Sequence, residues 1–303
     1  MALEVVTVFG GSGFLGRRIA ARMADAGAAV QVAVRRPERF DPGTLAEPGR
    51  VSALRADVRD ETSVAAALAG ADAVVNAVGL YVEGGGETFR AVHVEGAERV
   101  ARLAARAGAR ALVQISGIGA DPGSRSAYVR ARAEGEVRTL AAFPGATILR
   151  PSVLFGPDDA FLTLFARMAR LLPLLPIFGR GATRLQPAHV DDVAEAVVRA
   201  LEDPAAKGRV YELGGPRAYS YRELLSLVMA AAGRRRPLLP VPYTVWHLLA
   251  RLAAVLPRPP LTRDQVILME QDNVVGPDFP GFAELGIVPR SVEDSLPSCL
   301  SPG

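Results

Sequence analysis

The chain has 303 residues, of which 50% are hydrophobic and 22% are charged, and its formal net charge is +3. This composition excludes a disordered chain, a collagen-like repeat and a small disulfide scaffold, and the length suits one large α/β unit or two domains. Cys299 is the only cysteine, so neither an intramolecular disulfide nor a cysteine-based metal cluster can form. The densest basic cluster, Arg234–Arg236, is expected to be a solvated surface loop, and its shortness argues against a nucleic-acid footprint.

The sequence predicts neither a targeting segment nor a membrane-spanning helix. Met1 leads almost directly into the apolar run Val5–Phe9, which is typical of a folded strand rather than of a signal peptide. No window approaches about 18 uninterrupted apolar residues. The stretches Phe161–Phe178 and Trp246–Leu256 come closest, and we expect both to be packed helices, with a peripheral membrane contact as the alternative. We therefore expect a cytoplasmic protein, or one that lies on the inner face of a membrane.

Strand-like and helical stretches alternate regularly through the first half of the chain. The strand-like runs are rich in Val, Ile, Leu and Ala: Val5–Phe9, Ala29–Val34, Val51–Leu54, Ala73–Asn76, Ala111–Ile115 and Thr147–Leu149. The helical stretches between them are Leu15–Ala26, Val64–Leu68, Glu87–Ala107 and Ala127–Ala142. Strands with so little polar alternation are buried on both faces. The pattern predicts an α/β fold of the Rossmann type, with a doubly wound parallel sheet and helices on both faces.

The sequence pattern of the chain changes after Pro151. Prolines become frequent and apolar helices replace the regular alternation, although a helix at Asp191–Leu201 and a strand at Val210–Leu213 restore it briefly. We expect residues 1–150 to form the sheet domain, with residues 187–215 returning to it. Residues 151–186 and 216–303 are expected to form a smaller, mostly helical lobe for a substrate or partner.

A glycine-rich turn joins the first strand to the first helix. It consists of Gly10, Gly11, Ser12, Gly13, Phe14, Leu15 and Gly16. The three motif glycines allow the backbone to reverse, a pyrophosphate to approach the amides and the helix to lie close to the strand. The N–H groups and dipole at the start of that helix favour an anion. Because the motif follows an apolar strand and opens an amphipathic helix, it predicts a dinucleotide site.

The residues after the second strand indicate which dinucleotide the site prefers. Proteins that prefer NAD usually carry Asp or Glu there, whereas this chain has Arg35 and Arg36. Guanidinium groups bind a 2′-phosphate in a bidentate manner, so we expect NADP(H) to be preferred, with NAD(H) as the alternative. Further cofactor contacts are expected after the third and fourth strands, at Asp57, Val58, Asn76, Ala77, Val78 and Gly79. Asp57 could equally cap the helix that follows it.

Several motifs together carry a family resemblance. The glycine turn, the NAVG run at Asn76–Gly79, Ser116 and Tyr128 resemble the short-chain dehydrogenase/reductase superfamily. The motifs RPSVLFGP, HVDDVA and YELGG resemble its extended, epimerase-like branch. Together with SGIGAD and YVRARAEGE, they are most similar to an atypical subgroup, the NAD(P)H-binding accessory subunit of respiratory complex I and its bacterial relatives.

The resemblance implies a catalytic group of Ser, Tyr and Lys, which in this chain is incomplete. Ser116 and Tyr128 fall on matching positions, but the lysine position is Arg132. A guanidinium can hold a ribose and lower the pKa of the phenol, but it cannot relay a proton. The resemblance also carries Tyr128 and Pro151 over as cofactor contacts. The three histidines, His93, His189 and His247, lack metal-ligand spacing, and we expect no metal site.

Two functions are compatible with these observations. In the first, the protein binds NADP(H) with weak or no turnover and acts as an accessory or assembly protein. Its apolar lobe, around Phe161–Arg180, would meet a membrane-bound respiratory complex or a quinone-related lipid, which follows from the resemblance alone. In the second, it is an NADP-dependent oxidoreductase, epimerase or dehydratase acting on a hydrophobic carbonyl, with Tyr128 as acid/base, Ser116 as the oxyanion donor and Arg132 as the ribose clamp.

Overall fold

Seven parallel strands form the central sheet of the computed structural model, which describes residues 3–44, 46–256 and 259–300. The strand order is β11-β6-β5-β4-β1-β2-β3. The bounds are β1 (Val5–Phe9), β2 (Ala29–Val34), β3 (Val51–Arg55), β4 (Ala73–Asn76), β5 (Ala111–Ile115), β6 (Thr147–Pro151) and β11 (Val210–Leu213). Every neighbouring pair in this sheet is parallel, so the predicted Rossmann-type fold is confirmed. The chain reverses its direction across the sheet between β1 and β4, where such folds form a crevice at the carboxyl ends of the strands.

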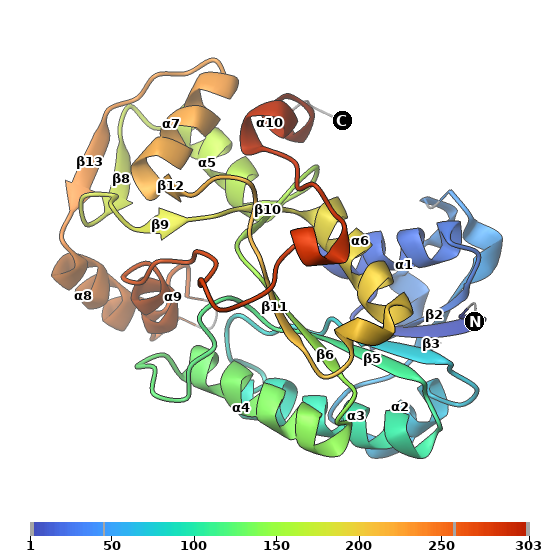
Figure 1. The fold of residues 1–303 in the computed structure, drawn as a ribbon. Helices are drawn as coiled ribbons and strands as arrows, with labels where there is room; N and C mark the ends of the chain where they lie inside the picture. Colours follow the sequence, from blue (N-terminus) through green and yellow to red (C-terminus); the bar gives the residue numbers. More distant parts are fainter. Residues whose placement is uncertain (1–2, 45, 257–258, 301–303) are drawn as a thin grey trace.

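Helices cover both faces of the sheet (Figure 1). On one face lie α1 (Phe14–Asp25) and α6 (Val190–Glu202), and on the other α2 (Glu61–Ala67), α3 (Ala97–Arg106) and α4 (Ala127–Ala142). Short 3-10 helices occur at η1 (Pro37–Arg39), η2 (Pro42–Thr44), η3 (Pro48–Arg50), η5 (Pro204–Ala206) and η6 (Ala283–Leu285). The residues predicted to return to the sheet do so, because β11 pairs with β6 and α6 packs on α1.

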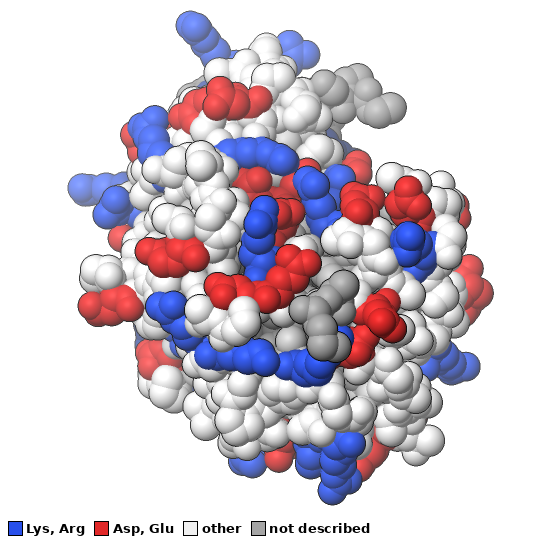
Figure 2. All heavy atoms as spheres, turned by 45° about the vertical axis from the view of Figure 1, so that its right-hand side comes forward, with Lys and Arg blue, Asp and Glu red and all other residues white. Residues whose placement is uncertain are grey.

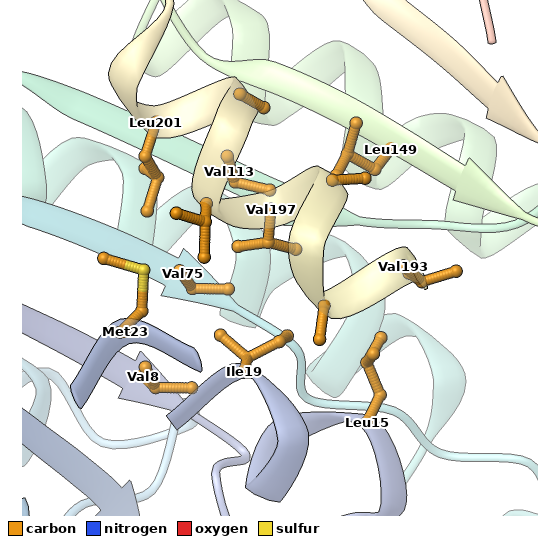
Figure 3. Packing of buried hydrophobic residues seen from close by; sticks show 14 of the residues in the cluster. Val8, Leu15, Ile19, Met23, Val75, Val113, Leu149, Val193, Val197 and Leu201 are labelled. Atoms are coloured by element: carbon orange, nitrogen blue, oxygen red, sulfur yellow. The ribbon is translucent and has the colours of Figure 1, made fainter. Parts of the chain in front are cut away.

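The main hydrophobic core lies between the sheet and the pair α1 and α6 (Figure 3). Ile19 and Met23 of α1 point toward Val197 and Leu201 of α6, over Val75 and other valines of the sheet. These helix residues recur at intervals of three or four, which places them on one face of each helix. The same core fixes the start of α1, and therefore the glycine turn that precedes it.

The predicted helix Glu87–Ala107 is not continuous in the structure. Residues Arg90–Gly96 form a π-helix, and only Ala97–Arg106 form the α-helix α3. Gly135 of α4 packs so closely on the π-helix that a Cβ there would lie 1.9 Å from the carbonyl oxygen of His93. No glycine or proline lies between Glu87 and Glu95, so the sequence carried no local signal for this change in helix type. π-turns inside helices often occur at functional sites.

The remaining elements form a lobe above the carboxyl end of the sheet (Figure 1). Its helices are α5 (Ala160–Leu171), α7 (Tyr221–Ala231), α8 (Tyr243–Ala253), α9 (Arg263–Leu268) and α10 (Val292–Leu300). Three strand pairs link them: β7 (Leu154–Phe155) with β10 (Ala188–His189), β8 (Leu175–Phe178) with β13 (Leu238–Val241), and β9 (Arg184–Leu185) with β12 (Tyr219–Ser220). Residues 280–287 run back from this lobe and add Phe282 and Leu285 to the main core.

Two expectations for apolar stretches of the lobe were wrong in part. The stretch Phe161–Phe178 is helical only as far as Leu171, because Pro173 and Pro176 cannot continue a helix, and its end forms β8. The stretch Trp246–Leu256 is helical as α8, but it is not packed as expected, since Ala250 is its one buried residue in the helix. The Asp159 carboxylate caps the start of α5, because it accepts a hydrogen bond from the Leu162 amide.

Candidate functional site

A cavity of about 260 Å³ opens at the carboxyl ends of β1, β2, β3 and β4. This is the crevice that the strand order predicts. It is lined by Phe9, Gly10, Ser12, Gly13, Ala33, Val34, Arg35, Ala56, Asp57, Val58, Arg59, Ala77, Val78, Gly79, Leu80, Glu87 and Val92. The lining is apolar along the strand ends and charged at one end, where the side chains of Arg35, Asp57, Arg59 and Glu87 lie together.

The glycine turn forms the floor of this cavity. Gly10 has a φ of +76°, and a Cβ there would lie 2.8 Å from the carbonyl oxygen of Ala77. At Gly16 a Cβ would lie only 2.2 Å from the carbonyl oxygen of Gly10, so α1 can approach the turn only because residue 16 has no side chain. No side chain caps the start of α1 at Gly13, which leaves its first amide groups to an anion. The turn therefore has the shape that a pyrophosphate needs.

Four charged side chains form an ion-pair cluster at the adenosine end expected for the cavity. Arg35 is paired with Glu87. Arg59 makes a bidentate contact with Asp57, with Nη2 2.6 Å and Nε 3.0 Å from the two carboxylate oxygens. It also lies 3.7 Å from Glu87. The hydrogen bond from Arg59, opposed by burial, holds the pKa of Asp57 below its usual range. Two guanidinium groups thus face the cavity, and Glu87 lies between them.

Asn76 shapes the fourth-strand turn rather than lining the cavity. Its side-chain amide donates to Gln114 Oε1 at 2.9 Å, and its carbonyl oxygen accepts from the Val78 amide at 3.3 Å. The side chain is buried. It fixes the backbone of Ala77, Val78 and Gly79, which do line the cavity. The sequence predicted the right turn, and the structure assigns Asn76 the role of holding it.

Tyr128 lies deep beside the cavity, enclosed by other rings. Its ring centre is 5.5 Å from those of Phe89 and His93 and 5.6 Å from that of Tyr81. Burial raises the pKa of its phenol, against the opposing charge of Arg132. His93 binds the backbone, because its Nε2 lies 2.9 Å from the carbonyl oxygen of Leu80. Leu80 both packs against this cluster and lines the cavity, so the two regions adjoin.

Arg132, at the position where the family resemblance implies a lysine, lies beside Tyr128. Its guanidinium carbon lies 4.8 Å from the centre of the Tyr128 ring. A Cβ on Gly117 would lie 2.8 Å from Nη1 of Arg132, so the missing side chain at residue 117 makes room for the guanidinium. Two buried polar atoms here, Arg132 Nε and Ser116 Oγ, have no hydrogen-bond partner within the described chain. Buried polar atoms without partners are rare and indicate a place for a ligand or water.

The start of α4, which carries Tyr128, is held by the lobe. Ser126 caps the helix by accepting from the Val129 amide at 3.3 Å, and its hydroxyl donates to Asp264 of α9. The same carboxylate oxygen accepts from the Tyr128 amide at 3.3 Å. The position of Tyr128 therefore depends on α9 being docked on the sheet domain.

The predicted site residues fall into two groups. Those that line the cavity are Gly10, Ser12, Gly13, Arg35, Asp57, Val58, Ala77, Val78 and Gly79. Those outside its lining are Gly11, Phe14, Leu15, Gly16, Arg36, Asn76, Ser116, Tyr128, Arg132 and Pro151. Sequence reasoning missed Arg59 and Glu87. Arg59 follows Asp57 by two residues and could have been noticed, whereas Glu87 is 52 residues from Arg35 and had no local signal.

Other kinds of site find no support in the described part of the chain. No group of three or more His, Cys, Asp or Glu side chains there is placed to hold a metal ion. Likewise, none of the helices between residues 3 and 300, outside the masked positions, has the length and hydropathy to cross a membrane. His189 serves as the cap of α6, since its Nδ1 accepts from the Asp191 amide at 3.3 Å.

The fold and the cavity together define a nicotinamide-dinucleotide-binding α/β protein. Its glycine turn would hold the pyrophosphate, and the unpartnered Ser116 and Arg132 atoms suit the nicotinamide ribose end. The chain belongs to the NAD dependent epimerase/dehydratase family, whose model matches residues 6–214.

Comparison with known proteins places the chain near two kinds of relative. Mitochondrial NADH dehydrogenase (ubiquinone) 1 alpha subcomplex subunit 9 of Arabidopsis thaliana is 32% identical over 302 residues, covering 95% of this chain and 75% of that protein. Ceramide reductase of Caulobacter vibrioides is 29% identical, covering 80% of this chain and 74% of that protein. Among solved structures, an NAD-bound dTDP-glucose 4,6-dehydratase from Streptomyces venezuelae matches with a TM-score of 0.72 and 22% identity, over 97% of this chain and 95% of that one. The predicted resemblance to the complex I accessory subunit is confirmed.

Proposed function

We propose that this protein binds NADP(H) tightly and serves as an accessory or assembly protein of a membrane respiratory complex, with weak or no turnover. The observation that carries the proposal is the pairing of Tyr128 with Arg132. When bound, the cofactor offers hydride transfer at its nicotinamide ring. The chain, however, supplies a deeply buried phenol with a raised pKa and a neighbouring guanidinium that cannot give up a proton. Binding without turnover is the consequence.

Support for a respiratory role comes from the relatives. Curated proteins that match 95% of this chain carry the name of a subunit of mitochondrial NADH dehydrogenase (ubiquinone). We assign the sheet domain, residues 1–150 with 187–215, to the cofactor, and residues 151–186 and 216–303 to the partner or to a quinone-related lipid. A protein of this kind would lie on the inner face of a membrane.

The preference for NADPH over NADH is part of the proposal. Arg35 lines the cavity after the second strand, and Arg59 lies beside it in the same ion-pair cluster. Two guanidinium groups can bind a 2′-phosphate, which a nearby carboxylate alone would repel. The test is fluorescence titration of both cofactors. Arg35→Ala and Arg59→Ala should each weaken NADPH binding and leave NADH binding unchanged, and equal affinity for both cofactors would refute the preference.

A second function is favoured by the unpartnered hydroxyl of Ser116 beside Tyr128 and by the ceramide reductase relative. In this case the protein reduces a hydrophobic carbonyl, with Tyr128 as the acid and Ser116 donating to the substrate oxygen. Ceramide-like ketones, quinones and simple aldehydes form the substrate panel.

One experiment separates the two functions. NADPH oxidation is followed with the panel for the wild type, Tyr128→Phe and Arg132→Lys. A binding protein shows no oxidation above the protein-free rate, and both variants still bind NADPH. Oxidation by the wild type that Tyr128→Phe abolishes would establish the enzyme instead.

A further inference from the structure

Helix α8 exposes leucine side chains that an ordinary surface helix would bury. Several of its apolar side chains face solvent, although Ala250 is buried: Leu248 is 56% exposed, Leu252 63%, and Val255, just beyond the helix, 85%. We call the exposed residues Val245, Leu248, Leu249, Leu252, Val255 and Leu256 the α8 patch. Helices of soluble domains normally bury such a stripe against the core. A contiguous exposed set of this kind indicates a contact surface.

The polar side of α8 lines a surface cavity instead. His247 and Arg251, one helical turn apart, face this space of about 500 Å³ together with Arg125, Arg263 and Ile267. Glu270 pairs with Arg125 and with His247, whose Nε2 lies 2.7 Å from its Oε1. Burial alone would raise the pKa of Glu270, but His247 and Arg125 outweigh it and hold the pKa below its usual range. The carboxylate is therefore ionised, and these two partners already bind it. Within the described chain, Arg251 and Arg263 have no carboxylate partner, which leaves two guanidinium groups for an outside anion.

Two segments of the lobe carry only basic charges. Residues 160–190 contain four arginines and residues 224–263 contain six, and neither segment contains an Asp or a Glu. These segments include α5, β8, β13 and α8, which all belong to the lobe (Figure 1). By contrast, basic and acidic side chains intermingle over the face drawn in Figure 2. The absence of acidic residues is thus a property of these two segments. Outside them, Asp264 and Glu270 are already bound within the protein, Asp264 by Ser126 and Glu270 by Arg125 and His247.

A second group of exposed apolar side chains lies at the same end. Leu171 ends α5, Leu172 and Leu174 follow it, and Leu239 lies on β13, which pairs with β8 and leads directly into α8. The rings of Phe178 on β8 and Trp246 on α8, with centres 4.4 Å apart, join the strand pair to the helix. The strand pair that carries Leu239 therefore packs directly on α8.

We propose that this end of the lobe binds the surface of an anionic phospholipid bilayer. The leucines of the α8 patch enter the boundary between headgroups and acyl chains, as interfacial helices do. Arg251 and Arg263 contact headgroup phosphates, and the long arginine side chains let their charges stay among them. Segments with basic but no acidic side chains are complementary in charge to an anionic lipid surface. A surface that binds a protein would be expected to carry charges of both signs. The inference does not depend on the dinucleotide site or on a respiratory role.

Vesicle flotation of the full chain tests the proposal. The wild type should float with vesicles that contain phosphatidylglycerol and stay behind with vesicles of phosphatidylcholine alone. Leu252→Ser with Val255→Ser, and separately Arg251→Gln with Arg263→Gln, should each weaken binding by about tenfold or more, since each basic residue near an anionic surface contributes appreciably. Matched controls are Val288→Ser, a 91% exposed valine outside the patch, and Arg106→Gln on α3.

Each result of the flotation experiment either supports or overturns the proposed membrane contact. Loss with both patch variants but with neither control, at an unchanged melting temperature, supports the proposal. Equal binding to neutral vesicles, or patch variants that bind like the wild type, overturns it. So does binding to native membranes combined with failure on protein-free anionic vesicles, because that result would indicate a protein partner for this surface.

Discussion

Arg35 and Glu87 form an ion pair across the charged end of the dinucleotide cavity, although they come from different connections of the sheet. Glu87 lies near Arg59 as well, so one carboxylate occupies two guanidinium groups that face the cavity. If NADP(H) binds as proposed, Glu87 would compete with its 2′-phosphate for the same donors.

Replacement of Glu87 should therefore strengthen NADPH binding. In Glu87→Gln the two arginines lose a competing charge, and we expect the affinity for NADPH to rise about tenfold while that for NADH stays the same. Fluorescence titration measures both affinities. Glu95→Gln, which removes an exposed carboxylate paired with Arg90, is the control. A fall in NADH affinity with no change for NADPH would mean that Glu87 binds the ribose hydroxyls instead.

The close approach of α1 to the glycine turn predicts a severe effect of a single methyl group. In Gly16→Ala the new Cβ would lie 2.2 Å from the backbone oxygen of Gly10, so the turn or the helix must shift. We expect the affinity for either cofactor to fall by about a hundredfold, since binding geometry tolerates little displacement. Calorimetric titration gives the affinity. Gly49→Ala, where the Cβ would meet nothing within 4 Å, should bind normally. Full affinity in Gly16→Ala would contradict the assigned pyrophosphate site.

His93 should make the protein less stable in mild acid. Burial, helped by the charge of Arg132, lowers the pKa of His93 from 6.5 to about 4, so the folded chain holds the neutral ring. The unfolded chain takes up a proton at higher pH, and the stability contributed above pH 6.5 is lost progressively as the pH falls toward 4. The loss amounts to about 3 kcal/mol of unfolding free energy.

Chemical denaturation across this pH range, with His93→Gln for comparison, measures the effect. The variant has no ring to protonate, so its unfolding free energy should fall less steeply between pH 6.5 and 4. Parallel pH profiles for the two proteins would show that His93 titrates normally in the fold.

Arg150 holds two buried carboxylates together beneath the lobe. Its Nη2 lies 2.6 Å from Glu136 Oε2 and its Nη1 lies 3.3 Å from Glu212 Oε1. Arg150→Leu leaves both carboxylates without a counter-charge and should lower the unfolding free energy by about 3–5 kcal/mol. The triple variant with Glu136→Leu and Glu212→Leu should recover most of that loss. Thermal and chemical unfolding test this, and a triple variant no more stable than Arg150→Leu would show that packing, not charge, sets the cost.

Much of the sheet domain could be predicted because its signals are local. Apolar runs of four to six residues, such as Ala29–Val34, form strands wherever both faces are covered, and the glycine turn at Gly10–Gly16 requires its backbone shape in any context. The lobe was harder to predict. Trp246–Leu256 has the composition of a packed helix, but whether such a helix faces the core or solvent depends on neighbours from other parts of the chain.

The residues of the cavity, too, differ in whether the sequence could predict them. The motif residues on the strand ends follow from the sequence, because each lies within a few residues of a recognisable strand. Glu87 and the rings around Tyr128 do not, since they come from the π-helix region and from loops that meet only after folding.

The sequence by itself determined that the chain forms a parallel α/β sheet and where its glycine-rich turn lies, because strands and tight turns are signalled by neighbouring residues. Only the tertiary structure decided that Glu87 meets Arg35 and that Asp264 holds the helix of Tyr128. Only the tertiary structure, likewise, shows that the leucines of α8 face solvent. These contacts join residues far apart in the chain, and their geometry is set by how whole elements pack.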